Sequence, residues 1–151
     1  QGDVEQLLLQ EIVLGIGGYH VLDQLGIEHA ILHLNEGHPA FVLLERVWER
    51  VERGMDYEDA VQEVKNTSVF TTHTPVLAGH DVFPFPLMEK YFGFYWESLG
   101  LDRETFFQLG TNPQAPDAGF NMTVLALKMS DHRNAVSKRH GEVTRAMWHG
   151  L

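Results

Sequence analysis

The sequence contains no cysteine, few basic residues and no long apolar run. Without cysteine, neither a disulfide framework nor a thiolate metal site can form, and this composition fits the cytoplasm, where we expect the protein. Eleven Lys and Arg stand against 21 Asp and Glu, which gives a net charge of -10. Nucleic acids and anionic membranes both attract basic surfaces, so we expect neither as a partner. No segment approaches the roughly 20 apolar residues of a membrane span.

The motifs of several enzyme classes are absent as well. There is no G-x-S-x-G serine motif and no HExxH zinc motif. The glycines at 15, 17 and 18 resemble a nucleotide-binding loop only loosely, because no strand precedes them and no Lys-Ser/Thr follows. We interpret them instead as a place where small residues let a neighbouring helix approach. A carboxylate pair such as Glu36 and Asp81 could serve a glycosidase, but the sequence does not give their separation.

The segments that are present alternate between strand and helix. Short apolar or β-branched runs predict strands at 31–34, 68–72 and 134–137. Continuous rather than alternating apolar runs favour a parallel sheet covered by helices on both faces, as in Rossmann-like α/β domains. Apolar periodicity and caps predict helices at 7–25, 39–52, 56–64, 87–99, 102–109, 121–129 and 142–148.

Both ends of the chain suggest a piece of a longer protein. The sequence starts at Gln1 without an initiator Met or signal peptide and passes directly into helix-like sequence. It stops at Leu151, just after the last predicted helix. We therefore expect residues 1–151 to be part of one domain.

The segment His-Leu-Asn-Glu-Gly-His-Pro at 33–39 lies where a predicted strand ends and a helix begins. Ligands of open α/β sheets bind outside the carboxyl ends of the strands. Asn35, Glu36 and His38 can all hydrogen-bond sugar hydroxyls, and a helix N-terminus adds free N–H groups. The alternative is a simple Asn/Glu turn in which His38 is an incidental helix cap.

The segment Phe-Thr-Thr-His-Thr-Pro at 70–75 repeats this arrangement. A strand delivers His73 and Thr74 into a loop, and Pro75 keeps Thr74 out of the helical region. We expect main-chain carbonyls near His73 to be free for a ligand. The alternative is a histidine that only caps or fills the core.

Two other interpretations stay open at this level. The nine histidines raise the idea of a zinc site from His38, His73 and Asp81, but no spacing demands one and we expect no metal site in this chain. The aromatic residues between 83 and 96 are expected to form core, with a sugar-stacking surface as the alternative. These aromatic residues are Phe83, Phe85, Tyr91, Phe92, Phe94, Tyr95 and Trp96.

Six segments, in order along nearly the whole chain, resemble the α-glucan (glycogen, starch or maltodextrin) phosphorylases, most closely the shorter bacterial and archaeal type. The segments are residues 10–18, 33–41, 69–76, 78–81, 120–127 and 140–143. This family has a two-domain glycosyltransferase (GT-B) fold, and the resemblance covers the later part of its N-terminal Rossmann-like domain. Relatives often carry Asp-Thr-His where this chain has Glu36-Gly37-His38, and the segment 131–137 departs from the family's usual Val-Asn-Gly-Val pattern.

The resemblance implies a function for the parent protein and roles for four residues. The family's enzymes transfer a terminal α-1,4-linked glucose to phosphate, which gives glucose 1-phosphate and a shortened glucan. Glu36, His38 and Thr74 would contact the sugar. His73 would be the catalytic residue, with its main-chain carbonyl facing the charge that develops at the anomeric carbon.

The resemblance also implies what must come from elsewhere. Pyridoxal phosphate is held by a lysine of the family's C-terminal domain, which this sequence does not include, so we expect no cofactor in this chain and no activity from it alone. The partners would be the glucan, phosphate and that domain. Exposed apolar surface suggests self-association into a homo-oligomer. The alternatives are a glycogen synthase-like enzyme that uses a sugar nucleotide and a non-catalytic carbohydrate-binding module.

Overall fold

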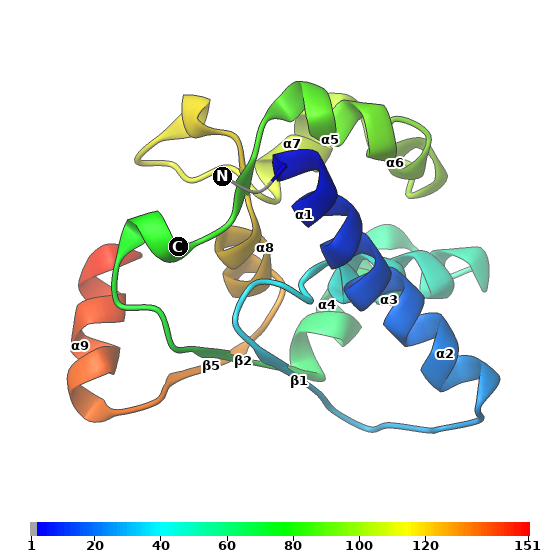
Figure 1. The fold of residues 1–151 in the computed structure, drawn as a ribbon. Coiled ribbons are helices and arrows are strands. Elements are labelled where there is room, and N and C mark those ends of the chain that lie inside the picture. Colours follow the sequence, from blue (N-terminus) through cyan, green and yellow to red (C-terminus); the bar gives the residue numbers. More distant parts are fainter. Residues whose placement is uncertain (1–2) are drawn as a thin grey trace.

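A small parallel sheet lies at the centre of the fold (Figure 1). The computed structural model describes residues 3–151; Gln1 and Gly2 lie outside them. The strands β1 (Leu32–Asn35), β2 (Ser68–Thr72) and β5 (His132–Ala135) pair in the order β1-β2-β5, all parallel. The predicted α/β class with a parallel sheet and flanking helices is therefore confirmed.

The third strand differs from its prediction. It lies at His132–Ala135 rather than 134–137, and its side chains are mostly exposed. The strand pairs with β2 alone, and His132, Arg133 and Asn134 are all exposed, so its pattern is polar rather than a continuous apolar run. The sequence criterion for a buried strand could not place it.

The predicted helix at 7–25 forms as three helical pieces. These are α1 (Val4–Ile12), the wider π-turn η1 (Val13–Gly17) and α2 (Gly18–Gln24). The helix ends at Gly26, whose φ of 66° suits glycine, as predicted. The expectation that this helix is buried was wrong. Leu8, Glu11, Gly15 and Tyr19 are buried at three- and four-residue spacing and Ile12 and Ile16 are half-buried against the core, but most of the other aliphatic side chains are exposed.

Gly15 is the point where this helix meets the next one. A Cβ at Gly15 would lie 2.9 Å from the Val42 backbone nitrogen and 3.1 Å from Phe41 Cβ. We expect Gly15→Ala to lower the free energy of unfolding by about 1–2 kcal/mol through overpacking, measured by urea denaturation. Gly18→Ala is the matched control, because nothing lies within 4 Å of its Cβ position and alanine favours helix. Equal effects of the two substitutions would contradict close packing at Gly15.

Two helices connect β1 to β2. The first, α3 (Phe41–Glu52), follows Pro39, and the second, α4 (Tyr57–Asn66), follows Asp56 at its N-cap position. The buried Arg46 of α3 donates to the hydroxyls of Thr67 and Ser68 at 2.8 Å each, which fastens α3 to the start of β2. These contacts fix where β2 begins relative to the helices.

The remaining elements surround a second, two-stranded pairing. The strands β3 and β4 pair antiparallel, with Val82 opposite Asn121. As predicted, Asp102 and Asn121 cap the helices that follow them, accepting from Thr105 N at 2.7 Å and Val124 N at 3.0 Å. The elements are η2 (Leu77–Gly79), β3 (Val82–Phe83), α5 (Phe85–Phe92), α6 (Tyr95–Ser98), α7 (Arg103–Gln108), η3 (Pro116–Ala118), β4 (Phe120–Asn121), α8 (Met122–Lys128) and α9 (Lys138–Met147).

The aromatic residues mostly form core, as predicted. Phe92 and Phe106 stack with ring centroids 5.6 Å apart, and Phe106 stacks on Phe120 at 5.7 Å. Phe94 is the exception: it is 91% exposed because it lies in the turn between α5 and α6. Among residues 3–151, no helix combines the length and apolar character that crossing a membrane requires.

Candidate functional site

The carboxyl ends of β1 and β2 lie side by side at one edge of the sheet. Asn35 pairs with Thr71 in register, and the Glu36 N–H donates to the Thr71 carbonyl at 2.9 Å, one residue beyond the end of β1. The two sequence segments that were singled out, 33–39 and 70–75, therefore emerge at the same place. Because paired parallel strands run in the same direction, the carboxyl ends of β1 and β2 must lie together.

Glu36 joins the two strand ends. Its Oε1 accepts hydrogen bonds from the backbone N–H groups of His73 and Thr74, the latter at 2.5 Å. Its backbone has a φ of 67°, which is uncommon for a residue other than glycine. Within residues 3–151 its Oε2 accepts no hydrogen bond, so that oxygen is free for a ligand. The structure thus brings three of the four predicted residues into direct contact.

The ring of His73 is exposed at the same edge. Its Nε2 lies 3.2 Å from the Asn35 side-chain oxygen, and Thr74 beside it is half-buried. No turn, loop or side-chain donor in the described part of the chain bonds to the main-chain carbonyl of His73. This agrees with the expectation that a carbonyl near His73 is free for a ligand.

His38 has a different partner. Its Nδ1 lies 2.8 Å from Asp81 Oδ2, and its side chain is 53% exposed. If Nδ1 carries the ring proton and donates a hydrogen bond to Asp81, Nε2 has no proton and is a hydrogen-bond acceptor. No hydrogen bond joins His38 to Glu36, His73 or Thr74 in the described structure.

The turn after β1 and the residue before β3 both pack on the start of α8. Asp81 accepts at its backbone oxygen from Met122 N at 3.0 Å. A Cβ at Gly37 would lie 3.0 Å from Thr123 N, so a small residue lets this turn approach α8. The pairing of His38 with Asp81, 43 positions apart, is therefore set by α8 and the strand β4 before it.

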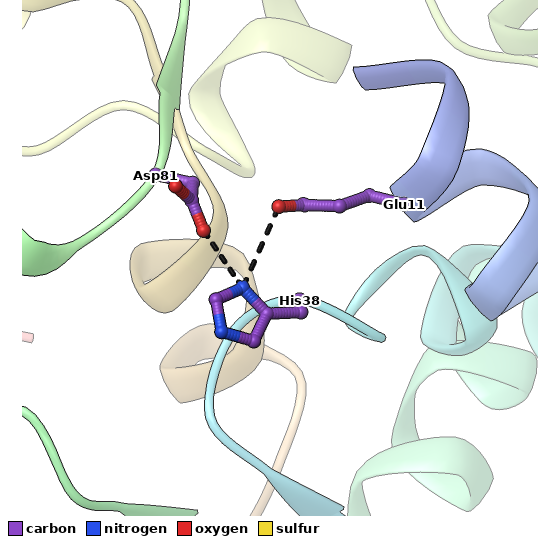
Figure 2. A group of neighbouring side chains, drawn as sticks. All are labelled: Glu11, His38 and Asp81. Carbon is purple, nitrogen blue, oxygen red and sulfur yellow. Dashed lines mark hydrogen bonds and ion pairs between the residues drawn. The ribbon is translucent and has the colours of Figure 1, made fainter. Parts of the chain in front are cut away.

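The residue that sequence reasoning missed is Glu11. It projects from α1 toward His38 and Asp81 (Figure 2), is only 2% exposed, and its Oε1 lies 3.6 Å from His38 Nδ1. Burial, reinforced by the nearby Asp81 carboxylate, raises the pKa of Glu11 to about 9. Glu11 lies on the inward stripe with Leu8 and Gly15 at three- and four-residue spacing, but aliphatic residues on every side of this helix hid that stripe in the sequence. A carboxylate on such a stripe is rarely buried without a partner.

Two of the three residues in the zinc set considered from sequence lie together, and the third does not. His38 and Asp81 meet, but the ring of His73 is turned to Asn35 instead. Within residues 3–151, the acid and histidine side chains that could share an ion are Glu11, His38 and Asp81, with one ligand atom from each within 4.8 Å of the others.

A chain of polar side chains crosses the sheet beside this edge. His33 Nε2 lies 2.7 Å from Thr71 Oγ1, and Thr71 lies 2.5 Å from the Asn134 side-chain oxygen. These residues come from β1, β2 and β5 in turn. Their hydrogen bonds link the three strands through side chains as well as through the backbone. A separate cavity of about 350 Å³ lies beyond β5, lined among others by Thr72, Arg133 and Arg145.

Comparisons with known proteins confirm the resemblance. No protein-family model matches the chain. The chain is 44% identical to maltodextrin phosphorylase of Thermococcus litoralis over 99% of its own length and 17% of that protein. It is 40% identical to glycogen phosphorylase of Aquifex aeolicus over 97% of its length and 21% of that protein. Glycogen phosphorylase of Mycobacterium tuberculosis is 37% identical over 99% of the chain and 18% of that protein.

The chain thus spans about a fifth of the curated relatives it matches. Its similarity to them extends over nearly all of its own residues. The chain therefore corresponds to a segment of the glycogen and maltodextrin phosphorylases.

Proposed function

We propose that this chain forms one wall of the glucose site of an α-1,4-glucan phosphorylase. The whole protein would convert glucan and phosphate into glucose 1-phosphate and a shortened glucan. The observation that carries the proposal is the Glu36 bridge, which holds the loop of His73 and Thr74 beside the end of β1. The similarity to proteins named glycogen and maltodextrin phosphorylase supports the choice of substrate.

Each residue would have a distinct role at this wall. Glu36 Oε2 and His38 Nε2 would accept hydrogen bonds from sugar hydroxyls, and Thr74 would lie beside the ring. The main-chain carbonyl of His73 would direct its negative end toward an oxocarbenium-like anomeric carbon. A fixed dipole stabilises such a charge in the transition state without becoming a nucleophile.

The chain's own residues do not fit pyridoxal phosphate. That cofactor needs a lysine amine, and the lysines of the described residues lie outside the proposed sugar site. Lys65 pairs with Asp131, Lys90 with Glu5, Lys128 with the backbone oxygens of Gln108 and Thr111, and Lys138 begins α9. In the proposed cytoplasmic GT-B parent, the cofactor and the phosphate ligands would come from another domain.

A chimaera tests the proposal. The matched segment of the Thermococcus litoralis maltodextrin phosphorylase would be replaced by this chain, and glucose 1-phosphate release from maltodextrin and phosphate would be assayed. We expect an active chimaera, and no release from this chain alone. His38→Ala should lower kcat/KM about tenfold through loss of the hydrogen bond from a sugar hydroxyl to Nε2. His132→Ala, at an exposed histidine on β5, is the control. A folded chimaera without activity, or equal effects of the two substitutions, would count against the proposal.

A further inference from the structure

Glu11 is a buried carboxylate without a hydrogen-bond donor. Neither of its side-chain oxygens is exposed or accepts a hydrogen bond from the described residues. An isolated carboxylate costs several kcal/mol to bury, so the group must be neutralised by a proton or by a cation. In the metal-free chain a proton fulfils this role, and the residues around Glu11 show what a cation would find there.

The surroundings of Glu11 supply further metal-ligand atoms. His38 Nδ1 lies 2.8 Å from Asp81 Oδ2 and 3.6 Å from Glu11 Oε1. Ligand atoms about 2.1 Å from a tetrahedral ion are about 3.4 Å from one another. The pair of His38 Nδ1 and Glu11 Oε1 is already close to this spacing, and His38 Nδ1 and Asp81 Oδ2, now at hydrogen-bond distance, need to separate by only a few tenths of an ångström.

We propose that Glu11, His38 and Asp81 bind one divalent first-row metal ion, with Zn²⁺ or Mn²⁺ as the chemical class. Two carboxylates supply a charge that matches the ion, and the imidazole supplies a nitrogen ligand. Three protein ligands leave coordination positions open, and the half-exposed side of His38 gives water access to them. The site forms whether or not the same edge of the sheet binds a sugar.

Metal binding would change the hydrogen-bonding character of His38. With Nδ1 on the ion, the remaining proton of the neutral ring must be on Nε2. Nε2 would then donate a hydrogen bond, whereas it accepts one when Nδ1–H donates to Asp81. The ¹⁵N chemical shifts of the His38 ring report this exchange directly.

The test is a titration of the full, metal-stripped chain with Zn²⁺ and, separately, with Mn²⁺. Calorimetry follows Zn²⁺ binding, and the EPR signal of free Mn²⁺ follows the second ion. We expect one ion per chain. Glu11→Gln and Asp81→Asn should each weaken binding roughly tenfold or more, because each removes one of three ligands. The ¹⁵N spectrum of the wild type should show metal on His38 Nδ1.

Matched controls separate this site from surface histidines. Glu52→Gln removes an exposed carboxylate of α3, and His20→Gln breaks the other close histidine–glutamate pair, His20–Glu45 at 2.9 Å. Both should bind the ion as the wild type does. If Glu11→Gln fails to give a native circular dichroism spectrum, Glu11→Asp keeps the charge but withdraws the carboxylate and should also weaken binding. The absence of saturable binding, or binding unchanged by the Glu11 and Asp81 substitutions, would overturn the proposal.

Discussion

Replacing Glu36 with alanine should lower the free energy of unfolding by about 3 kcal/mol, because two hydrogen bonds to a charged acceptor disappear together. The Glu36 carboxylate is the acceptor for the backbone N–H groups of both His73 and Thr74. Without this carboxylate, the two N–H groups lose the acceptor that links them to the end of β1. The loop that carries His73 should then lose its fixed position at the sheet edge.

Urea denaturation and amide hydrogen exchange measure the two parts of this effect. Exchange at His73 and Thr74 should accelerate more than exchange within β2. Glu36→Gln keeps a neutral acceptor and should cost only about 1 kcal/mol. Glu52→Ala, the same change at an exposed position of α3, is the control and should stay within about 0.5 kcal/mol of the wild type. Unchanged exchange at His73 and Thr74 in Glu36→Ala would show that the bridge does not hold the loop.

Glu11→Gln should stabilise the metal-free protein at alkaline pH. The pKa of Glu11 in the folded chain is about 9, raised from 4.5 first by burial and then by Asp81. Between these two values the folded state holds a proton that the unfolded state has released. Stability from this group is therefore complete below the unfolded pKa and is lost as the pH rises toward 9. Glutamine is neutral throughout and removes this loss.

The expected size follows from the linkage relation. Each pH unit inside this window changes the free energy of unfolding by at most about 1.4 kcal/mol. Between pH 6 and pH 8, Glu11→Gln should thus gain up to about 2.7 kcal/mol relative to the wild type. Urea denaturation at both pH values, with a chelator present, measures the difference, and Glu52→Gln is the control. A difference that is independent of pH would mean that Glu11 is not protonated in the folded chain.

Local signals in the sequence predicted much of the secondary structure. The strand at 68–72, the caps at Asp102 and Asn121, and the helix end at Gly26 all have the predicted form. Each depends on residues within a few positions of one another. The misplaced strand at His132–Ala135 and the exposed aliphatic face of residues 7–25 depend on neighbours far away in the sequence. No local pattern could show that β5 is an edge strand.

The candidate site divides in the same way. Residue chemistry placed polar groups at two strand ends, which lie together because paired parallel strands end at the same side of the sheet. The resemblance then selected Glu36, His38, His73 and Thr74 among them. Their roles toward a sugar remain predictions. The sequence did not indicate that one carboxylate oxygen of Glu36 would accept hydrogen bonds from two backbone N–H groups.

The sequence by itself determined the α/β class, the resemblance to glucan phosphorylases and the two polar strand ends. Only the tertiary structure decided which side chains meet there. Glu36 reaches His73 across 37 positions and His38 reaches Asp81 across 43, while Glu11 approaches them from a separate helix. Contacts at such separations depend on how the helices pack against the sheet. Burial then changes the chemistry of the groups, since the pKa of Glu11 is raised by loss of water and by a carboxylate 70 positions away.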